Sequence, residues 1–179
     1  MSQKINVLPI LAEHVQSLRD HATNRTSILD LFVFFAVPIG VAGLVTWRNF
    51  NLRATAVNGL VSSFSLFATI LLSLLVMLFS FIQATEKHAG DPLLLHRRRL
   101  LRELNANIAF AVLLSIGIVA ISLIALSALQ KDQDPIARPF TFLLVAGFVA
   151  FILNVLMITK RMYVLMNNEL DRTRTRRSA

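Results

Sequence analysis

Four long apolar segments alternate with short polar segments along this chain. The apolar segments cover about residues 28–47, 57–83, 105–130 and 140–160. Each is close to the roughly 20 residues that cross a bilayer as an α-helix. The pattern predicts an all-α membrane protein, in which residues 28–161 form a bundle of four transmembrane helices.

The second apolar segment, residues 57–83, carries polar side chains at steps of three, four or seven. At about 100° per residue they fall within an arc of roughly 80° on one helix face. A hydroxyl group gains nothing from contact with hydrocarbon, so this face should contact protein or water. The residues of this polar stripe are Asn58, Ser62, Ser65, Thr69, Ser73, Ser80 and Gln83.

The polar stripe has two interpretations. Small residues allow two helix backbones to approach closely, and their hydroxyls hydrogen-bond across the contact. Alternatively, the stripe is repeated around an oligomer axis and lines a water-filled pore. Because four helices give one chain little interior, we predict that the stripe faces protein and supports self-association.

The segments before and after the four apolar ones are polar. In residues 1–27, Leu8, Leu11, Val15 and Leu18 recur at helical spacing. This spacing predicts a short amphipathic helix that lies on the membrane, on a partner or on the protein's own loops. Residues 162–179 are predicted to form a basic cytoplasmic tail, and the composition of its part after Leu170 is typical of a disordered segment.

The distribution of basic residues predicts the orientation in the membrane. The formal net charge is +8, and 14 of the 18 Lys and Arg residues precede the first apolar segment, link the second to the third, or follow the fourth. The other four are Arg48, Arg53, Lys131 and Arg138. Positive residues in short loops are retained in the cytoplasm, so both termini should be cytoplasmic.

Composition limits the class of protein further. The chain is 55% hydrophobic, with a mean hydropathy of +0.65, and the four apolar segments leave no room for a separate enzyme domain. It contains no cysteine, which excludes disulfides and thiolate metal sites. These features fit a protein of a bacterial inner membrane.

The link between the second and third apolar segments contains a turn at Asp91-Pro92. After this turn, we expect one continuous helix that leads into the third segment. Its basic residues have three interpretations: they bind anionic lipid headgroups, bind an acidic partner protein, or only orient the chain. The candidate residues here are His96, Arg97, Arg98, Arg99 and Arg102, and those in the tail are Arg172, Arg174, Arg176 and Arg177.

Four residues in the first and fourth apolar segments are candidates for helix packing. Pro38 removes a helical hydrogen bond and is expected to shape the first helix. Gly147, Ala150 and Asn154 share one face of the fourth segment. An amide inside a span must find a partner, so Asn154 is expected to bond another helix.

Several kinds of chemistry lack the residues that they need. No apolar segment has a charged residue near its midpoint, although proton pumps and ion-coupled transporters usually need one. No phosphate-binding loop, zinc-protease motif or nucleophile with a nearby base is present. The tail has no aromatic residues to stack on bases. We therefore expect a non-enzymatic protein without catalytic residues, cofactor, metal site or direct nucleic-acid binding.

Two stretches of the chain resemble a family of small bacterial membrane proteins. These are Asp30-Leu-Phe-Val-Phe-Phe-Ala-Val-Pro38 and Asn58-Gly-Leu-Val-Ser-Ser-Phe-Ser-Leu-Phe67. They resemble four-span antiphage-defence proteins such as the membrane subunit of the Kiwa system and retron-associated membrane effectors. The resemblance implies a subunit that acts with a separately encoded cytoplasmic protein.

The sequence thus leads to two functional hypotheses. In the first, the protein is an oligomeric, non-enzymatic inner-membrane component of an antiphage defence system. It senses or perturbs the membrane, contacts anionic lipids and is coupled to a cytoplasmic partner. In the second, it is a holin-like or toxic pore-forming protein that acts alone, because small size, several spans and a basic tail also occur in holins.

Overall fold

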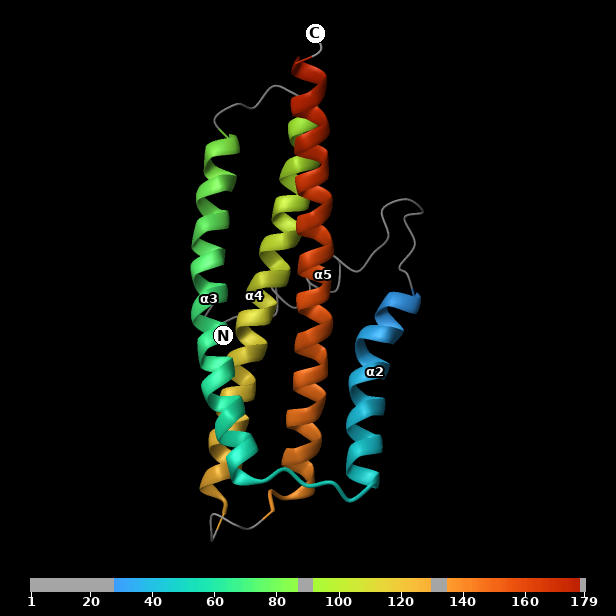
Figure 1. Ribbon diagram of the computed structural model, residues 1–179, viewed down its shortest axis with the longest axis vertical. Coiled ribbons are helices and arrows are strands. Elements are labelled where there is room, and N and C mark those ends of the chain that lie inside the picture. The colour runs from blue at the N-terminus through green and yellow to red at the C-terminus, as the bar shows by residue number, and fades with distance from the viewer. Residues whose placement is uncertain (1–27, 87–91, 130–134, 178–179) are drawn as a thin grey trace, which may run out of the picture.

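The computed structural model describes residues 28–86, 92–129 and 135–177, which form four α-helices and the turns beside them. The helices are α2 (Ile28–Trp47), α3 (Ala54–Glu86), α4 (Pro92–Ser127) and α5 (Arg138–Arg177). Figure 1 shows them side by side as an elongated assembly. This described part contains no strand, so the all-α prediction is confirmed. The predicted amphipathic helix in residues 1–27 lies outside the described residues.

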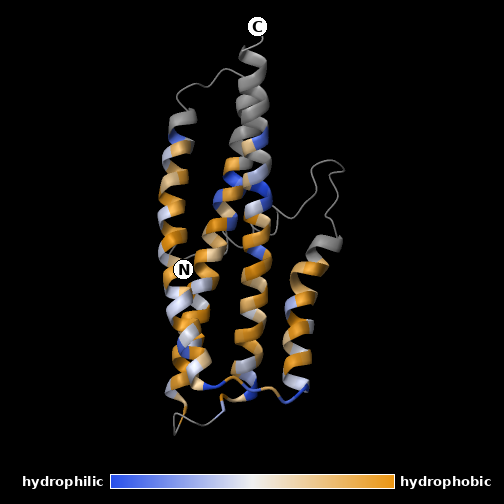
Figure 2. Cartoon of the chain, in the orientation of Figure 1, coloured by the Kyte–Doolittle hydropathy of each residue, from blue (hydrophilic) through white to orange (hydrophobic). Residues whose placement is uncertain are grey.

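Three of the described helices are long and apolar enough to cross a membrane. Their apolar stretches are Ala54–Phe81, Leu101–Ser127 and Arg138–Tyr163, and hydrophobic residues dominate them in Figure 2. These stretches overlap the second, third and fourth predicted spans, which are therefore helical and long and apolar enough to cross a membrane. In α2 the described apolar stretch, Phe32–Trp47, is shorter, so the first predicted span stays a prediction.

Two helices extend well beyond the predicted spans. Helix α4 begins at Pro92, as the predicted turn at Asp91-Pro92 requires, because proline suits the first position of a helix. Helix α5 continues to Arg177, so the prediction that the tail after Leu170 is disordered is wrong for residues 171–177. Once a helix is nucleated, each further residue adds a hydrogen bond, and the long apolar span supplies that nucleus.

The four helices form an open array instead of a closed bundle. Helix α3 packs against α4, α4 against α5, and α5 against α2, whereas α3 and α5 meet mainly through phenylalanine rings. Helices α2 and α3 therefore lie at opposite edges of the array (Figure 1). Within α2, Pro38 and Ala42 are buried, and α5 is the helix that covers them. The packing role predicted for Pro38 agrees with this position.

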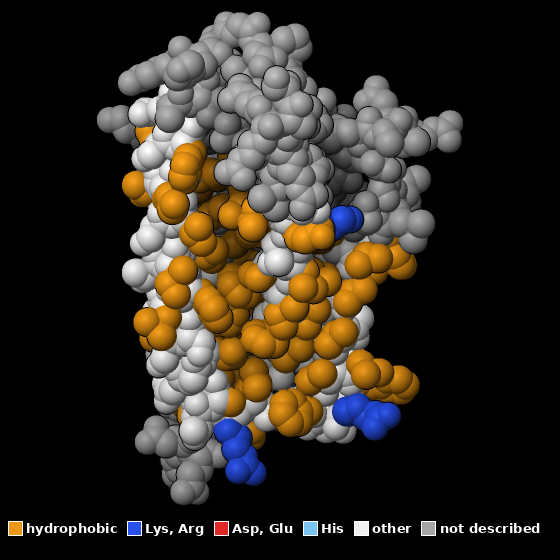
Figure 3. Space-filling view, turned by 45° about the horizontal axis from the view of Figure 1, so that its top comes forward, with side chains coloured by type: hydrophobic (Ala, Val, Ile, Leu, Met, Phe, Trp, Pro, Cys, Tyr) orange, Lys and Arg blue, Asp and Glu red, His pale blue; other side chains and the backbone are white. Residues whose placement is uncertain are grey.

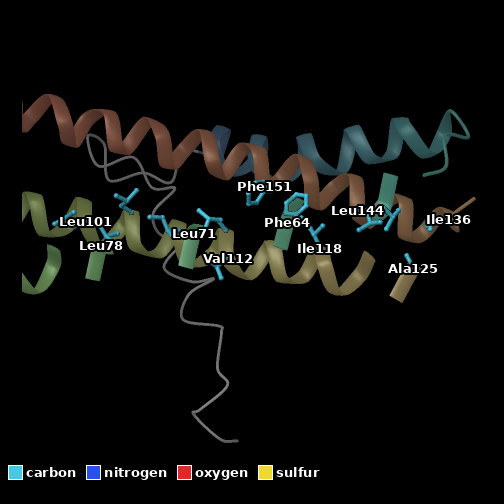
Figure 4. Packing of buried hydrophobic residues seen from close by; sticks show 14 residues of the cluster. Phe64, Leu71, Leu78, Leu101, Val112, Ile118, Ala125, Ile136, Leu144 and Phe151 are labelled. Atoms are coloured by element: carbon cyan, nitrogen blue, oxygen red, sulfur yellow. The ribbon is translucent and has the colours of Figure 1, made fainter. Parts of the chain in front are cut away.

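The core lies along α4, between α3 and α5. Helix α3 contributes Val57, Phe64, Leu71 and Leu78, which are buried and seven residues apart. A seven-residue repeat keeps one line of side chains against a neighbouring helix. Figure 4 shows this line facing α4, and Phe64 also reaches Phe151 of α5, with ring centroids 4.9 Å apart. The aromatic contact joins the three helices near their middle.

Helices α4 and α5 approach each other closely at Gly147. A Cβ atom at this position would lie 3.0 Å from Cγ1 of Ile118, whose side chain is buried. A larger residue would push the two helices apart, because the core side chains around Ile118 leave it little room. The packing role predicted for Gly147 therefore has a structural basis, and Ala150, one turn away, is half-buried.

At one end of the array, the residues before α3 are bonded to those before α5. We call this the short-loop end; it comprises residues 48–53 and 135–138. Asn49 ends α2 in the left-handed conformation, with φ of 55°, as is common after a helix. The Ile136 amide donates to the Leu52 carbonyl at 2.9 Å, and Arg138 Nη2 donates to Asn49 Oδ1 at 2.7 Å. These bonds hold the two loops together.

Candidate membrane interaction site

The polar stripe of α3 lies on the outside of the array. All seven of its residues are exposed, whereas the buried line that includes Phe64 and Leu71 faces α4. At 100° per residue, the two lines are separated by roughly 140° around the helix. The stripe therefore contacts no other described helix of the same subunit. Packing among the described helices of one chain, the simplest explanation of the stripe, does not account for it.

The hydroxyl groups of the stripe bond to their own helix. Ser62 donates to the Asn58 carbonyl at 3.1 Å, and Thr69 donates to the Ser65 carbonyl at 3.0 Å. Ser73 and Ser80 donate to the carbonyls four residues earlier at 3.1 and 3.2 Å. Such back-bonding satisfies these four of the five stripe hydroxyls without a second helix. The surface is thus small and only weakly polar, and a neighbouring helix can approach it closely.

The structure also defines how far the stripe is continuous. Between Ser73 and Ser80 the same face is occupied by Val76, which is 67% exposed. Toward the start of α3, the small-residue surface includes Thr55 and Gly59, which are exposed. No atom lies within 4 Å of a Cβ built on Gly59. Sequence analysis missed these two residues, although their spacing of four was a detectable signal.

A second polar cluster joins α4 to α5. The Asn154 amide nitrogen donates to the Asn107 carbonyl at 3.0 Å, so the prediction that Asn154 bonds another helix is confirmed. One to two turns away, Arg161 Nη1 lies 3.2 Å from Glu103 Oε2. The Asn154 Oδ1 atom is buried and has no hydrogen-bond partner among the described residues. Sequence analysis missed Glu103 and Asn107, whose spacing of four places them on one helix face.

The predicted basic contacts are only partly described. Arg102 is exposed on α4, at the end where α4 begins and α5 ends; we call this the extended end. The backbone of residues 96–99 lies in α4, and that of residues 172–177 lies in α5. The side chains of His96, Arg97, Arg98 and Arg99 and of Arg172, Arg174, Arg176 and Arg177 lie outside the description. The structure therefore places these residues at one end without showing what they contact.

The described residues contain no group of three His, Cys, Asp or Glu side chains close enough to hold a metal ion. No protein-family model, curated protein or solved structure matches this chain.

Proposed function

We propose that this chain is an oligomeric, non-enzymatic membrane protein of a bacterial antiphage defence system, coupled to a separately encoded cytoplasmic partner. In this proposal the protein resides in the inner membrane with both termini in the cytoplasm. It senses or perturbs the membrane and transmits that state to the partner. The position of the polar stripe on the outside of α3 is the observation that carries this proposal, because it indicates assembly beyond one subunit.

Membrane embedding is supported by the surface of the array. Large apolar side chains are exposed along α2, α3 and α5, and Figure 3 shows them across one face. A soluble monomer rarely exposes so large an apolar area. Arg138 and Lys160 are 22 residues apart on α5, or about 33 Å along the helix, which matches the roughly 30 Å hydrocarbon core. Trp47 and Tyr163 are exposed at opposite ends, where interfacial aromatic residues belong.

Helix α2 completes the membrane domain as a fourth span in this proposal. Its 20 residues correspond to about 30 Å. Its exposed side chains are bulky and apolar, including Phe32, Phe35 and Trp47, which suits contact with lipid. A fourth span also places both termini on the same side, as the distribution of basic residues predicts.

Self-association is proposed to use α3, because the two edges of the array differ. Both helices expose large apolar side chains, but only α3 also exposes a stripe of small polar residues, from Asn58 to Ser73. Without a hydrophobic force between helices in lipid, association depends on close packing, which small residues allow. A contact between the α3 helices of two subunits satisfies this condition symmetrically.

Partner binding is proposed to occur at the extended end. Helix α4 begins nine residues before its apolar stretch at Leu101, and α5 continues 14 residues past Tyr163. At 1.5 Å per residue, these extensions reach about 13 and 21 Å beyond the span. They carry His96, Arg97, Arg98, Arg99 and the four arginines from residue 172 to residue 177. The defence context rests on the resemblance of residues 30–38 and 58–67 to defence membrane proteins.

Affinity purification from host membranes tests the partner. We expect wild-type protein to capture a soluble protein that Arg97→Gln/Arg98→Gln/Arg99→Gln captures at least about tenfold less, because charge pairs dominate such a contact. Arg48→Gln/Arg53→Gln/Arg138→Gln, which loses the same charge at the short-loop end, should capture it normally. A C-terminal topology reporter confirms that neither variant has inverted. The proposal would be contradicted if the Arg97→Gln/Arg98→Gln/Arg99→Gln variant captured as much of the soluble protein as the wild type does, or if the wild type captured none.

The pore alternative is also favoured by one observation, the exposure of the stripe. Gly147 of α5 packs against Ile118 of α4, which leaves no channel between these two helices at that level. A pore would therefore be lined by the α3 stripes of several subunits. We expect expression of this chain alone to leave a membrane-potential dye signal unchanged for one doubling time. Depolarisation within minutes, at an expression level where an unrelated four-span protein has no effect, would establish the pore instead.

A further inference from the structure

The short-loop end carries three arginines that the positive-inside pattern does not explain. Arg48, Arg53 and Arg138 are all exposed, and we call them the arginine patch. Residues 48–53 and 135–140 contain no Asp or Glu. If the extended end is cytoplasmic, these arginines lie on the opposite side of the membrane. Basic residues on that side work against the orientation that the positive-inside rule predicts. Their presence there therefore calls for a separate reason.

Hydrogen bonds between the loops place the three arginines at the same end of the array. Arg138 bonds the side chain of Asn49, which is next to Arg48 in the chain. The bond between Ile136 and the Leu52 carbonyl places Arg53, the next residue, against the same segment. Like charges at one end of the protein repel one another, and a bound anion relieves the repulsion. No acidic side chain among the described residues forms an ion pair with these arginines.

The helix termini add to the positive potential. Arg53 directly precedes α3, and Arg138 is the first residue of α5; neither helix has an acidic residue in its first turn. Helix N-termini carry partial positive charge and unpaired N–H groups, so they favour anions and disfavour arginine. Two such N-termini and three guanidinium groups therefore lie at the same end of the array. A phosphate group has the negative charge and the acceptor oxygens to bind both the N–H groups of the helix N-termini and the guanidinium groups.

Neighbouring apolar side chains indicate where the phosphate comes from. Trp47 is 82% exposed and Phe50 is 58% exposed, and both flank Arg48 in the chain. Tryptophan prefers the headgroup level of a bilayer. In Figure 3, basic side chains at this end lie directly beside exposed hydrophobic ones. This combination fits a phospholipid, whose phosphate contacts the arginines while its acyl chains contact the aromatic and aliphatic surface.

We propose that the arginine patch and Trp47 form a binding site for the headgroup phosphate of an anionic phospholipid. The inference rests on the proposed membrane location and adds a specific lipid site at the short-loop end. The lipid neutralises the patch and anchors the bonded loops at the membrane surface. Asn49 is a positioning residue, since its side chain holds the Arg138 guanidinium in place.

Trp47 provides the probe, because it is the only tryptophan in the chain. The protein is placed in phosphatidylcholine nanodiscs that contain a small, fixed fraction of lipid brominated near the headgroup. The brominated lipid is either phosphatidylglycerol or phosphatidylcholine, and quenching of Trp47 fluorescence is compared. We expect brominated phosphatidylglycerol to quench about threefold more strongly, because each arginine near the surface adds to its enrichment.

Variants separate a defined site from general attraction by the positive charge of the protein. Arg48→Gln/Arg53→Gln/Arg138→Gln should lower the quenching ratio to about one. Lys160→Gln/Arg97→Gln/Arg98→Gln, which loses the same charge elsewhere, should keep the wild-type ratio. Asn49→Gly suits the positive φ but removes the bond to Arg138, so it should give an intermediate ratio.

The outcomes distinguish this site from the proposed function. Absence of quenching by either brominated lipid would contradict the membrane location itself. Equal quenching by the two lipids in the wild type would overturn the lipid site and leave the membrane location intact. An unchanged ratio in the patch variant would also overturn the site, provided that the Trp47 emission maximum shows the loops to be intact.

Discussion

Replacing Ser65 and Thr69 together by leucine is expected to lower the association constant of the protein about 30-fold. In each substitution the larger side chain prevents the two helices from packing closely, which costs about 1 kcal/mol of association free energy. The sum of about 2 kcal/mol corresponds to a factor of about 30 in the association constant. The stability of the single subunit should change little. Both residues are exposed, and the Thr69 hydroxyl bonds only to its own helix. Energy transfer between labelled copies in bicelles measures the association constant.

The chain offers a matched control for this variant. Ser63 lies on α3 but off the stripe, and Thr159 of α5 is exposed and bonds the Val155 carbonyl at 2.9 Å. Ser63→Leu/Thr159→Leu makes the same chemical changes and should leave association unchanged. If the stripe variant associates as strongly as this control, α3 is not the contact between subunits.

The same stripe can be probed for water. Because the chain has no cysteine, single cysteines at Ser62, Ser65 and Ser73 can be labelled without background. A face that packs against another subunit should react slowly with a membrane-impermeant thiol reagent, compared with a cysteine at Arg53. Reaction at the rate of the Arg53 cysteine would show that the stripe is wet, and the pore interpretation would then replace self-association through a dry contact.

Substituting Glu103 by glutamine is expected to destabilise the subunit by about 2 kcal/mol. This value lies between the small contribution of an exposed ion pair and the 3–5 kcal/mol lost when one partner of a buried pair is removed. The Glu103 and Arg161 side chains are 15% and 16% exposed, so the pair is largely shielded from water. Without the carboxylate, the Arg161 guanidinium remains between α4 and α5 without its counter-charge.

The nearby amide should contribute less. Asn154→Leu removes the hydrogen bond to the Asn107 carbonyl, but it also removes the buried Oδ1 atom that lacks a partner. Replacing a polar group together with its unsatisfied atom is close to neutral, so we expect a change within about 1 kcal/mol. The Glu103 and Asn154 substitutions should therefore differ in their effect on the free energy of unfolding, although both residues lie in the contact between α4 and α5.

Steric trapping with two introduced cysteines measures these free energies of unfolding in bicelles. Lys160→Gln is the control, because Lys160 is exposed and next to Arg161; it should cost less than about 0.5 kcal/mol. A double-mutant cycle with Arg161→Gln should give a favourable coupling energy. A Glu103→Gln effect no larger than that of Lys160→Gln would show that the ion pair does not hold α4 to α5.

The sequence determined the elements that depend on local patterns. Three apolar spans, the helix start at Pro92 and the grouping of Asn58, Ser65 and Thr69 on one helix face follow from hydropathy, proline chemistry and the 3.6-residue period. The same reasoning failed for the tail, because composition near Arg172 does not reveal that a helix nucleated within the span continues through it. Periodicity fixes the angles between residues of the same helix.

Only the tertiary structure decided how each helix is rotated against its neighbours. In a membrane the core and the lipid are equally apolar, so hydropathy cannot distinguish the buried line at Phe64 from the exposed Leu66, nor place the stripe outside the array. The same holds for contacts between distant segments, such as Glu103 with Arg161 and Asn49 with Arg138. Each pair depends on which helices or loops become neighbours, and no local pattern encodes that choice.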